Sequence, residues 1–297
     1  MVSSTQLGSW TVLCDISGQV SNSLATPVVT LAAVAVACEV RNQVRGRLVR
    51  AFGGTPVKWK VGTLDGLKHV STLLASFKLP AAVLAIHRDE RWMRFYAEGE
   101  AFLTRNRVAG GGHIPGFADH VLRAQLMSAP FAYLVGKIVL KRYLRRNVPR
   151  RGNLRLQLVV DSDIRSPDGK RAFSEAMHLS ASTSGFAEVF GVSLTVETRV
   201  ETEQDEPLLL LPDYLAGVFQ HADPASRLDR PVVSQGAASL AVEALRSQVG
   251  TLLEENQAKF AGVFPLTHDT GGRVVRQRPT RRPAPRDSDM PDWLEPL

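Results

Sequence analysis

Cysteine is scarce in this chain: its 297 residues include only Cys14 and Cys38. No group of Cys and His residues has the spacing of a zinc site, and a chain of this length can bury a sufficient core without disulfide staples. Both cysteines lie in apolar runs, TVLC and AAVAVAC. We therefore expect two buried thiols that pack as small hydrophobic side chains.

Long hydrophobic runs are also missing. The longest apolar stretch, Pro27 to Cys38, is shorter than the about 20 residues needed to span a bilayer. The first ten residues, MVSSTQLGSW, have neither the charge nor the apolar run of a signal peptide. These absences predict a soluble, cytoplasmic protein that does not contact a membrane, and they indicate nothing about its oligomeric state.

Acidic residues are absent between Asp119 and Asp161, although the whole chain contains 29 of them. Lys137, Lys141 and Arg145 in this interval are spaced by four, which places them on one helix face. Such a face could bind nucleic-acid phosphates, and the net charge of +7 points weakly the same way. A solvated helix end explains the pattern equally well. The candidate nucleic-acid-binding residues here are Lys137, Lys141, Arg142, Arg145, Arg146, Arg150 and Arg151.

Strand and helix patterns alternate along the chain. Apolar or alternating segments predict strands at 10–15, 28–37, 81–87, 154–161 and 192–200. Helical spacing predicts helices at 39–52, 63–78, 117–146, 166–180 and 234–260, with another starting at Pro212. This alternation is typical of a three-layer α/β domain with a mixed sheet flanked by helices.

The chain divides into four parts. Residues 1–8 are expected to be a flexible N-terminus, 9–222 the α/β domain and 223–265 a C-terminal helical extension. Residues 266–297 are basic and proline-rich, then acidic, and we expect a disordered tail. The ending with Trp293 and Leu294 could dock onto a protein partner, although an inert tail is the simpler interpretation.

Three aspartates occur where strand or helix ends place a carboxylate at the edge of a sheet. Asp15 closes the first predicted strand, Asp161 closes LRLQLVVD, and Asp213 lies in the first turn of a helix. Burying such carboxylates is costly without a cation, which Mg²⁺ or Mn²⁺ would supply, with Asp163 as a further ligand. Two such ions about 4 Å apart can promote phosphodiester cleavage. Singly, each aspartate also suits a turn or a helix N-terminus.

The order of these motifs resembles that of a prokaryotic family, domain of unknown function 3800, which is placed in the ribonuclease H-like superfamily. The resemblance covers about residues 9 to 222. It implies a ribonuclease H-like mixed sheet and a metal-dependent nuclease site built on Asp15, Asp161 and Asp213. The matching stretches are Asp15-Ile16-Ser17-Gly18, the apolar strand 28–37, Pro56-Val57-Lys58-Trp59-Lys60, LVVD ending at Asp161, and Leu210 to Gly217.

Three positions depart from the family pattern. Ile16 replaces a glutamate, Pro56 an acidic residue and Leu210 a glutamine. Two hypotheses therefore stay open: a divalent-metal-dependent nuclease or related phosphodiester-processing protein, and a catalytically inactive relative that binds nucleic acid or assembles with a partner. An ATPase that uses DISGQV as a phosphate loop is weaker, because no second phosphate loop is found.

The stretch VKWKV contains two further candidates. Lys58 could contact a phosphate, or could equally belong to the polar face of a strand. Trp59 is expected in the core rather than on a base-stacking surface.

Overall fold

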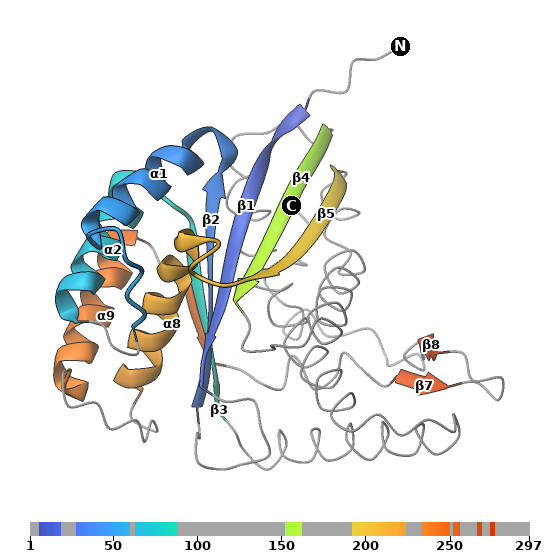
Figure 1. Ribbon diagram of the computed structural model, residues 1–297. Coiled ribbons are helices and arrows are strands. Elements are labelled where there is room, and N and C mark those ends of the chain that lie inside the picture. The colour runs from blue at the N-terminus through green and yellow to red at the C-terminus, as the bar shows by residue number, and fades with distance from the viewer. Residues whose placement is uncertain are drawn as a thin grey trace.

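The computed structural model describes residues 6–18, 28–59, 63–87, 152–161, 192–223, 233–249, 252–255, 266–268 and 274–276. Within these ranges, a six-stranded mixed sheet carries four helices on one face (Figure 1). The predicted helices 117–146 and 166–180 lie outside the described residues, as do Asp163 and the basic run from Lys137 to Arg151.

The strands follow the apolar segments of the sequence. β2 (Val28–Ala37) and β3 (Ala81–His87) have the predicted bounds, and β4 (Gly152–Asp161) and β5 (Val192–Glu201) differ by two residues or fewer. β1 (Gln6–Ser17) is longer than predicted at both ends. β1 is longer because it lies between two strands, and its polar ends still find partners: Gln6 pairs with β4, and Ser17 pairs with β2.

The strand order in the sheet is β5-β4-β1-β2-β3-β6. β1, β2 and β3 form an antiparallel meander, and β4 and β5 then add parallel to β1. The predicted α/β fold class, with a mixed sheet flanked by helices, is confirmed. Because β1, β4 and β5 run in the same direction, their carboxyl ends meet at one edge of the sheet.

The helices are α1 (Cys38–Ala51), α2 (Leu64–Ser76), α8 (Leu210–Ala222) and α9 (Gln235–Val249). Side-chain caps begin two of them: Thr63 accepts from the Gly66 N–H at 3.4 Å, and Ser234 from the Ala237 N–H at 3.2 Å. Among the described residues no helix is both long and apolar enough to cross a membrane.

Two helix predictions were wrong in their bounds. α8 begins at Leu210 rather than Pro212, after a 3₁₀ turn η2 (Pro207–Leu209), because the whole leucine run packs into the core. α9 ends at Val249 rather than at residue 260. The chain beyond it forms β6 (Leu252–Glu255), which pairs parallel with β3.

A single hydrophobic cluster fills the space between the sheet and these helices. α8 lies at its centre and is buried along almost its whole length, packed on β1 and β2. The sheet contributes Leu13 and Val159 to this cluster, and Trp59 lies in it as predicted. β2 is buried at nine successive positions, so both of its faces are covered.

One smaller expectation needs correction. Cys14 is buried, but Cys38 is exposed because it begins α1, where the chain leaves the sheet. Within the predicted disordered tail, β7 (Leu266–His268) and β8 (Val274–Arg276) form a short antiparallel pair. The rest of the tail, with Trp293 and Leu294, lies outside the described residues.

Candidate metal centre

Asp15 and Asp161 are brought together by the parallel pairing of β1 and β4. Cys14 is paired with Val160, so the next residue on each strand is one of these aspartates. Side chains alternate along a strand. Because Leu13 and Val159, two residues earlier, belong to the cluster under the helices, both aspartates project to that same face. The sequence predicted that Asp15 closes this strand, but β1 continues for two more residues, to Ser17.

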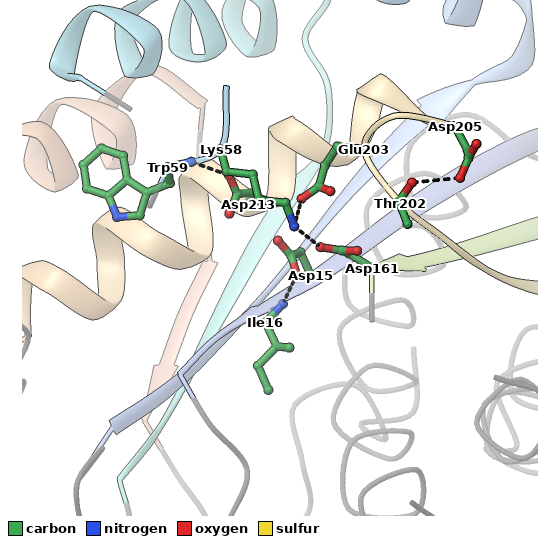
Figure 2. Close-up of polar contacts among 9 residues, drawn as sticks. All are labelled: Asp15, Ile16, Lys58, Trp59, Asp161, Thr202, Glu203, Asp205 and Asp213. Carbon is green, nitrogen blue, oxygen red and sulfur yellow. Dashed lines mark hydrogen bonds and ion pairs between the residues drawn. The ribbon is translucent and has the colours of Figure 1, made fainter. Parts of the chain in front are cut away.

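Glu203 joins them from the adjacent strand. Asp161 is paired with Glu201 of β5, and Glu203 follows two residues later, just beyond the strand. Carboxylate oxygens of Asp15, Asp161 and Glu203 lie within 4.8 Å of one another, and we call these residues the acidic triad (Figure 2). Sequence reasoning missed Glu203. The available signal was its place at the carboxyl end of a strand parallel to β4.

Asp213 lies beside the triad rather than in it. It is in the first turn of α8, and its Oδ2 accepts a hydrogen bond of 2.6 Å from the Trp59 backbone N–H. Its negative charge nevertheless raises the pKa of the Asp15 carboxyl group. The structure thus places two of the three predicted aspartates in the triad and the third at its border.

Lys58 extends into the triad. Its Nζ lies 3.1 Å from Asp161 Oδ2 and forms an ion pair with Glu203 Oε1 (Figure 2). Residues 56–58 belong to a loop, so the polar face of a strand does not explain this lysine. A phosphate contact stays a prediction, but the partners seen in the structure are carboxylates.

The loop that carries Lys58 is fixed at both ends. Gly53 and Gly54 follow the end of α1. Their φ angles of 64° and 87° favour glycine, and their N–H groups donate to the carbonyl oxygens of Arg50 and Val49. At the other end, the Trp59 side chain is 1% exposed and packs on α8 at Gly217, where a Cβ atom would overlap the indole ring. This close packing places Lys58 over the triad.

Burial makes the triad electrostatically costly. Asp15 is 5% exposed, and the side chains of Glu203 and Asp161 are 6% and 11% exposed. Burial, then the charges of Asp213 and Asp161, raise the pKa of Asp15, against a hydrogen bond from the Ile16 N–H that lowers it. Burial and the charge of Glu203 raise the pKa of Asp161 to about 7, although Lys58 opposes this shift.

The pKa of Lys58 is also raised, which for an amine favours the charged form. Burial alone would lower the pKa of its amine, but the hydrogen bond to Glu203 and the charge of Asp161 outweigh burial and raise it. The group is therefore a permanent cation beside carboxylates that carry excess negative charge.

The donor set fits a hard divalent ion. Mg²⁺ and Mn²⁺ favour carboxylate oxygens and retain several water ligands, and three carboxylates within 4.8 Å can share one ion. Within the described part of the chain, no Lys or Arg forms an ion pair with Asp15, whose Oδ1 accepts the Ile16 N–H at 2.6 Å. The Asp15 side of the triad is thus where added positive charge is most needed.

The three departures from the family pattern have plain structural consequences. Ile16 contributes its backbone N–H to Asp15. Pro56 lies in the loop before Lys58, and Leu210 is a buried core residue at the start of α8. None of these side chains adds a carboxylate, whereas Glu203, just beyond the end of β5, supplies one.

Comparisons with known proteins add little to this geometry. No family model matches the chain, and no curated protein matches it. Among solved structures, it is similar to the ribonuclease H2 from Pyrococcus horikoshii OT3, with a TM-score of 0.38 and 11% sequence identity. That similarity covers 80% of this chain and 99% of the other.

Proposed function

We propose that the protein is a divalent-metal-dependent nuclease, or a related phosphodiester-processing protein, of ribonuclease H-like type. The observation that carries this proposal is the buried acidic triad at the carboxyl ends of three parallel strands. Asp15, Asp161 and Glu203 would hold Mg²⁺ or Mn²⁺. The bound ion would lower the pKa of a water ligand and stabilise charge on the phosphate.

The substrate class we propose is nucleic acid. Its phosphodiester backbone is negatively charged, and this chain has a net charge of +7 and a pI near 9.7. On the described surface, α1 exposes Arg45, Arg47 and Arg50. The basic run from Lys137 to Arg151 remains a second candidate surface. Membership of domain of unknown function 3800, a prokaryotic and cytoplasmic origin, and a protein partner for Trp293 and Leu294 also remain proposals.

The test is cleavage by the full chain of labelled single- and double-stranded DNA, RNA and a DNA–RNA hybrid, with Mg²⁺ or Mn²⁺. We expect cleavage of at least one substrate, its loss in EDTA, and its loss in Asp161→Asn. Asp65→Asn is the matched control, because Asp65 is an exposed aspartate paired with Lys68 on α2. Cleavage that persists in EDTA would reject the proposal.

The second candidate function is a catalytically inactive relative that binds nucleic acid. The observation in its favour is Lys58, whose ammonium group already neutralises part of the triad. In that case, calorimetry would detect no Mg²⁺ or Mn²⁺ binding, while binding to the same nucleic acids would be unchanged by EDTA.

A further inference from the structure

We propose that Lys58 permanently occupies one of two cation positions in the acidic triad, so that the site binds one divalent ion rather than two. This inference rests on the proposed function, because it concerns how that site is loaded. It assigns a role to a residue of this chain, and it predicts an ion count that can be measured without any substrate.

The first argument is the position of the ammonium group. Lys58 Nζ lies 3.1 Å from Asp161 Oδ2 and also pairs with Glu203 Oε1, so it bridges two of the three carboxylates. An ion bound to those same two oxygens would have to lie about 2.1 Å from each. The ammonium group and such an ion cannot share this place. The Asp15 side of the triad is left for a metal.

The second argument is the charge balance. The ionised triad carries three negative charges, and the Asp213 carboxylate beside it is bound to the Trp59 N–H. Lys58 and one divalent ion together supply three positive charges. When Asp213 is counted, the negative charges are four. Two divalent ions added to Lys58 would supply five positive charges, which exceeds either count in a buried site, whereas one ion with Lys58 does not.

The third argument is that the backbone beside Lys58 is held in place. The residue that follows it is anchored twice, by its backbone N–H on Asp213 and by its buried indole on Gly217. The Lys58 side chain is 41% exposed, whereas those of its two partners are 6% and 11% exposed. The ammonium group thus forms the solvent side of the triad, while the carboxylates form its buried side.

The experiment counts Mn²⁺ ions bound per chain, by the loss of the free-ion electron paramagnetic resonance signal and by calorimetry. We expect one ion in the wild type, two in Lys58→Met and one in Lys58→Arg, which keeps the positive charge. Lys68→Met is the matched control with the same change in net charge, because Lys68 pairs with Asp65 on the surface of α2. It should bind one ion with unchanged affinity.

Several results would overturn the inference. Two ions in the wild type would do so without any variant, which matters if Lys58→Met fails to fold. An unchanged single ion in Lys58→Met would show that Lys58 holds no cation position. No ion in the wild type but one in Lys58→Met would mean that the lysine replaces the only metal, which would also favour the inactive relative.

The experiments can reject the role of Lys58 and the proposed nuclease function independently of each other. Two bound ions together with metal-dependent cleavage would reject the role of Lys58 and leave the nuclease in place. The expected count of one and two ions, without cleavage of any nucleic acid, would support the role of Lys58 and reject the nuclease.

Discussion

Two ion pairs in this molecule use the same chemistry in opposite surroundings. Lys58 lies 3.1 Å from Asp161 in the acidic triad, and Lys68 lies 2.9 Å from Asp65 on α2. At the surface, the hydrogen bond and charge of Lys68 lower the pKa of Asp65. In the triad, burial raises the pKa of Asp161 to about 7 despite Lys58. A lysine partner is therefore enough to keep the surface carboxylate ionised, but the buried carboxylate still lacks positive charge.

The difference teaches where to look for function. An exposed pair is solvated whether or not its partner is present, so it contributes little to stability or to binding. A buried group of carboxylates with one ammonium group among them costs free energy, and folding retains it only because the surrounding core holds it in place. Buried carboxylates that destabilise the fold in this way are typical of a binding site for a cation.

The largest expected effect is the loss of activity in Asp15→Asn. Removing this carboxylate takes away a charge on the side of the triad that Lys58 does not neutralise, so the ion is held less tightly. We expect metal-dependent cleavage to fall at least about a thousandfold, equivalent to about 4 kcal/mol. Asp65→Asn should cleave at the wild-type rate. Equal losses in both variants would show that a carboxylate of the triad matters no more for cleavage than one on the surface.

The packing that supports Lys58 gives the next largest effect. In Gly217→Ala the new methyl group overlaps the Trp59 ring, and both residues are buried. We expect the free energy of unfolding to fall by about 2–3 kcal/mol in urea titrations. Gly236→Ala is the control, because no atom lies within 4 Å of its added Cβ, and it should be neutral or stabilising. Comparable losses would show that Trp59 can move.

The two lysines should differ in stability as well. Without metal at pH 8, Lys58→Met leaves buried carboxylates uncompensated. We expect a loss of about 2 kcal/mol, less than for a fully buried pair because the lysine is partly exposed. Lys68→Met should change stability by less than about 0.5 kcal/mol. Added Mn²⁺ should restore Lys58→Met, since an ion that binds only the folded state stabilises it. If Mn²⁺ does not stabilise Lys58→Met, the buried carboxylates do not need positive charge for stability.

The sequence was sufficient for the features that depend on local pattern. Continuous apolar runs predicted β2 and β3 at their observed bounds, and helical spacing predicted the starts of α2 and α9 to within one residue. The chain order of strands and helices predicted the fold class. Asp15 and Asp161 were found because each comes at or near the end of an apolar strand.

The features that failed depend on pairing between distant segments. Glu203 is one of several glutamates in VETRVETEQDE, and only the register of β5 against β4 brings it to Asp161. Lys58 was ambiguous because its partners lie over a hundred residues away in sequence. The helix predicted to reach residue 260 stops early because residues 252–255 find a partner in β3. Asp213 lies outside the triad, with its carboxylate bound to the Trp59 backbone N–H, and its role as a metal ligand stays a prediction.

The smallest effect we expect is a dependence of stability on pH. Because the pKa of Asp161 is raised from 3.8 to about 7 in the folded state, the folded protein binds more protons than the unfolded chain between these values. The stabilisation from this proton is complete below about pH 4 and is lost as the pH rises through 7. Without metal, we therefore expect the wild type to lose on the order of 2 kcal/mol between pH 5 and 8, or several degrees in melting temperature.

The contrast with the surface pair shows whether burial is the cause. Asp161→Asn should reduce this slope and leave the part that comes from Asp15, whose pKa is also raised. Asp65→Asn should keep the slope, because the pKa of Asp65 is lowered and its own contribution has the opposite sign. Saturating Mg²⁺ should flatten or reverse the slope of the wild type, since the ion binds the ionised triad and competes with protons. A metal-free wild type that is more stable at pH 8 than at pH 5, with Asp161→Asn unchanged from it, would mean that the triad is not short of positive charge.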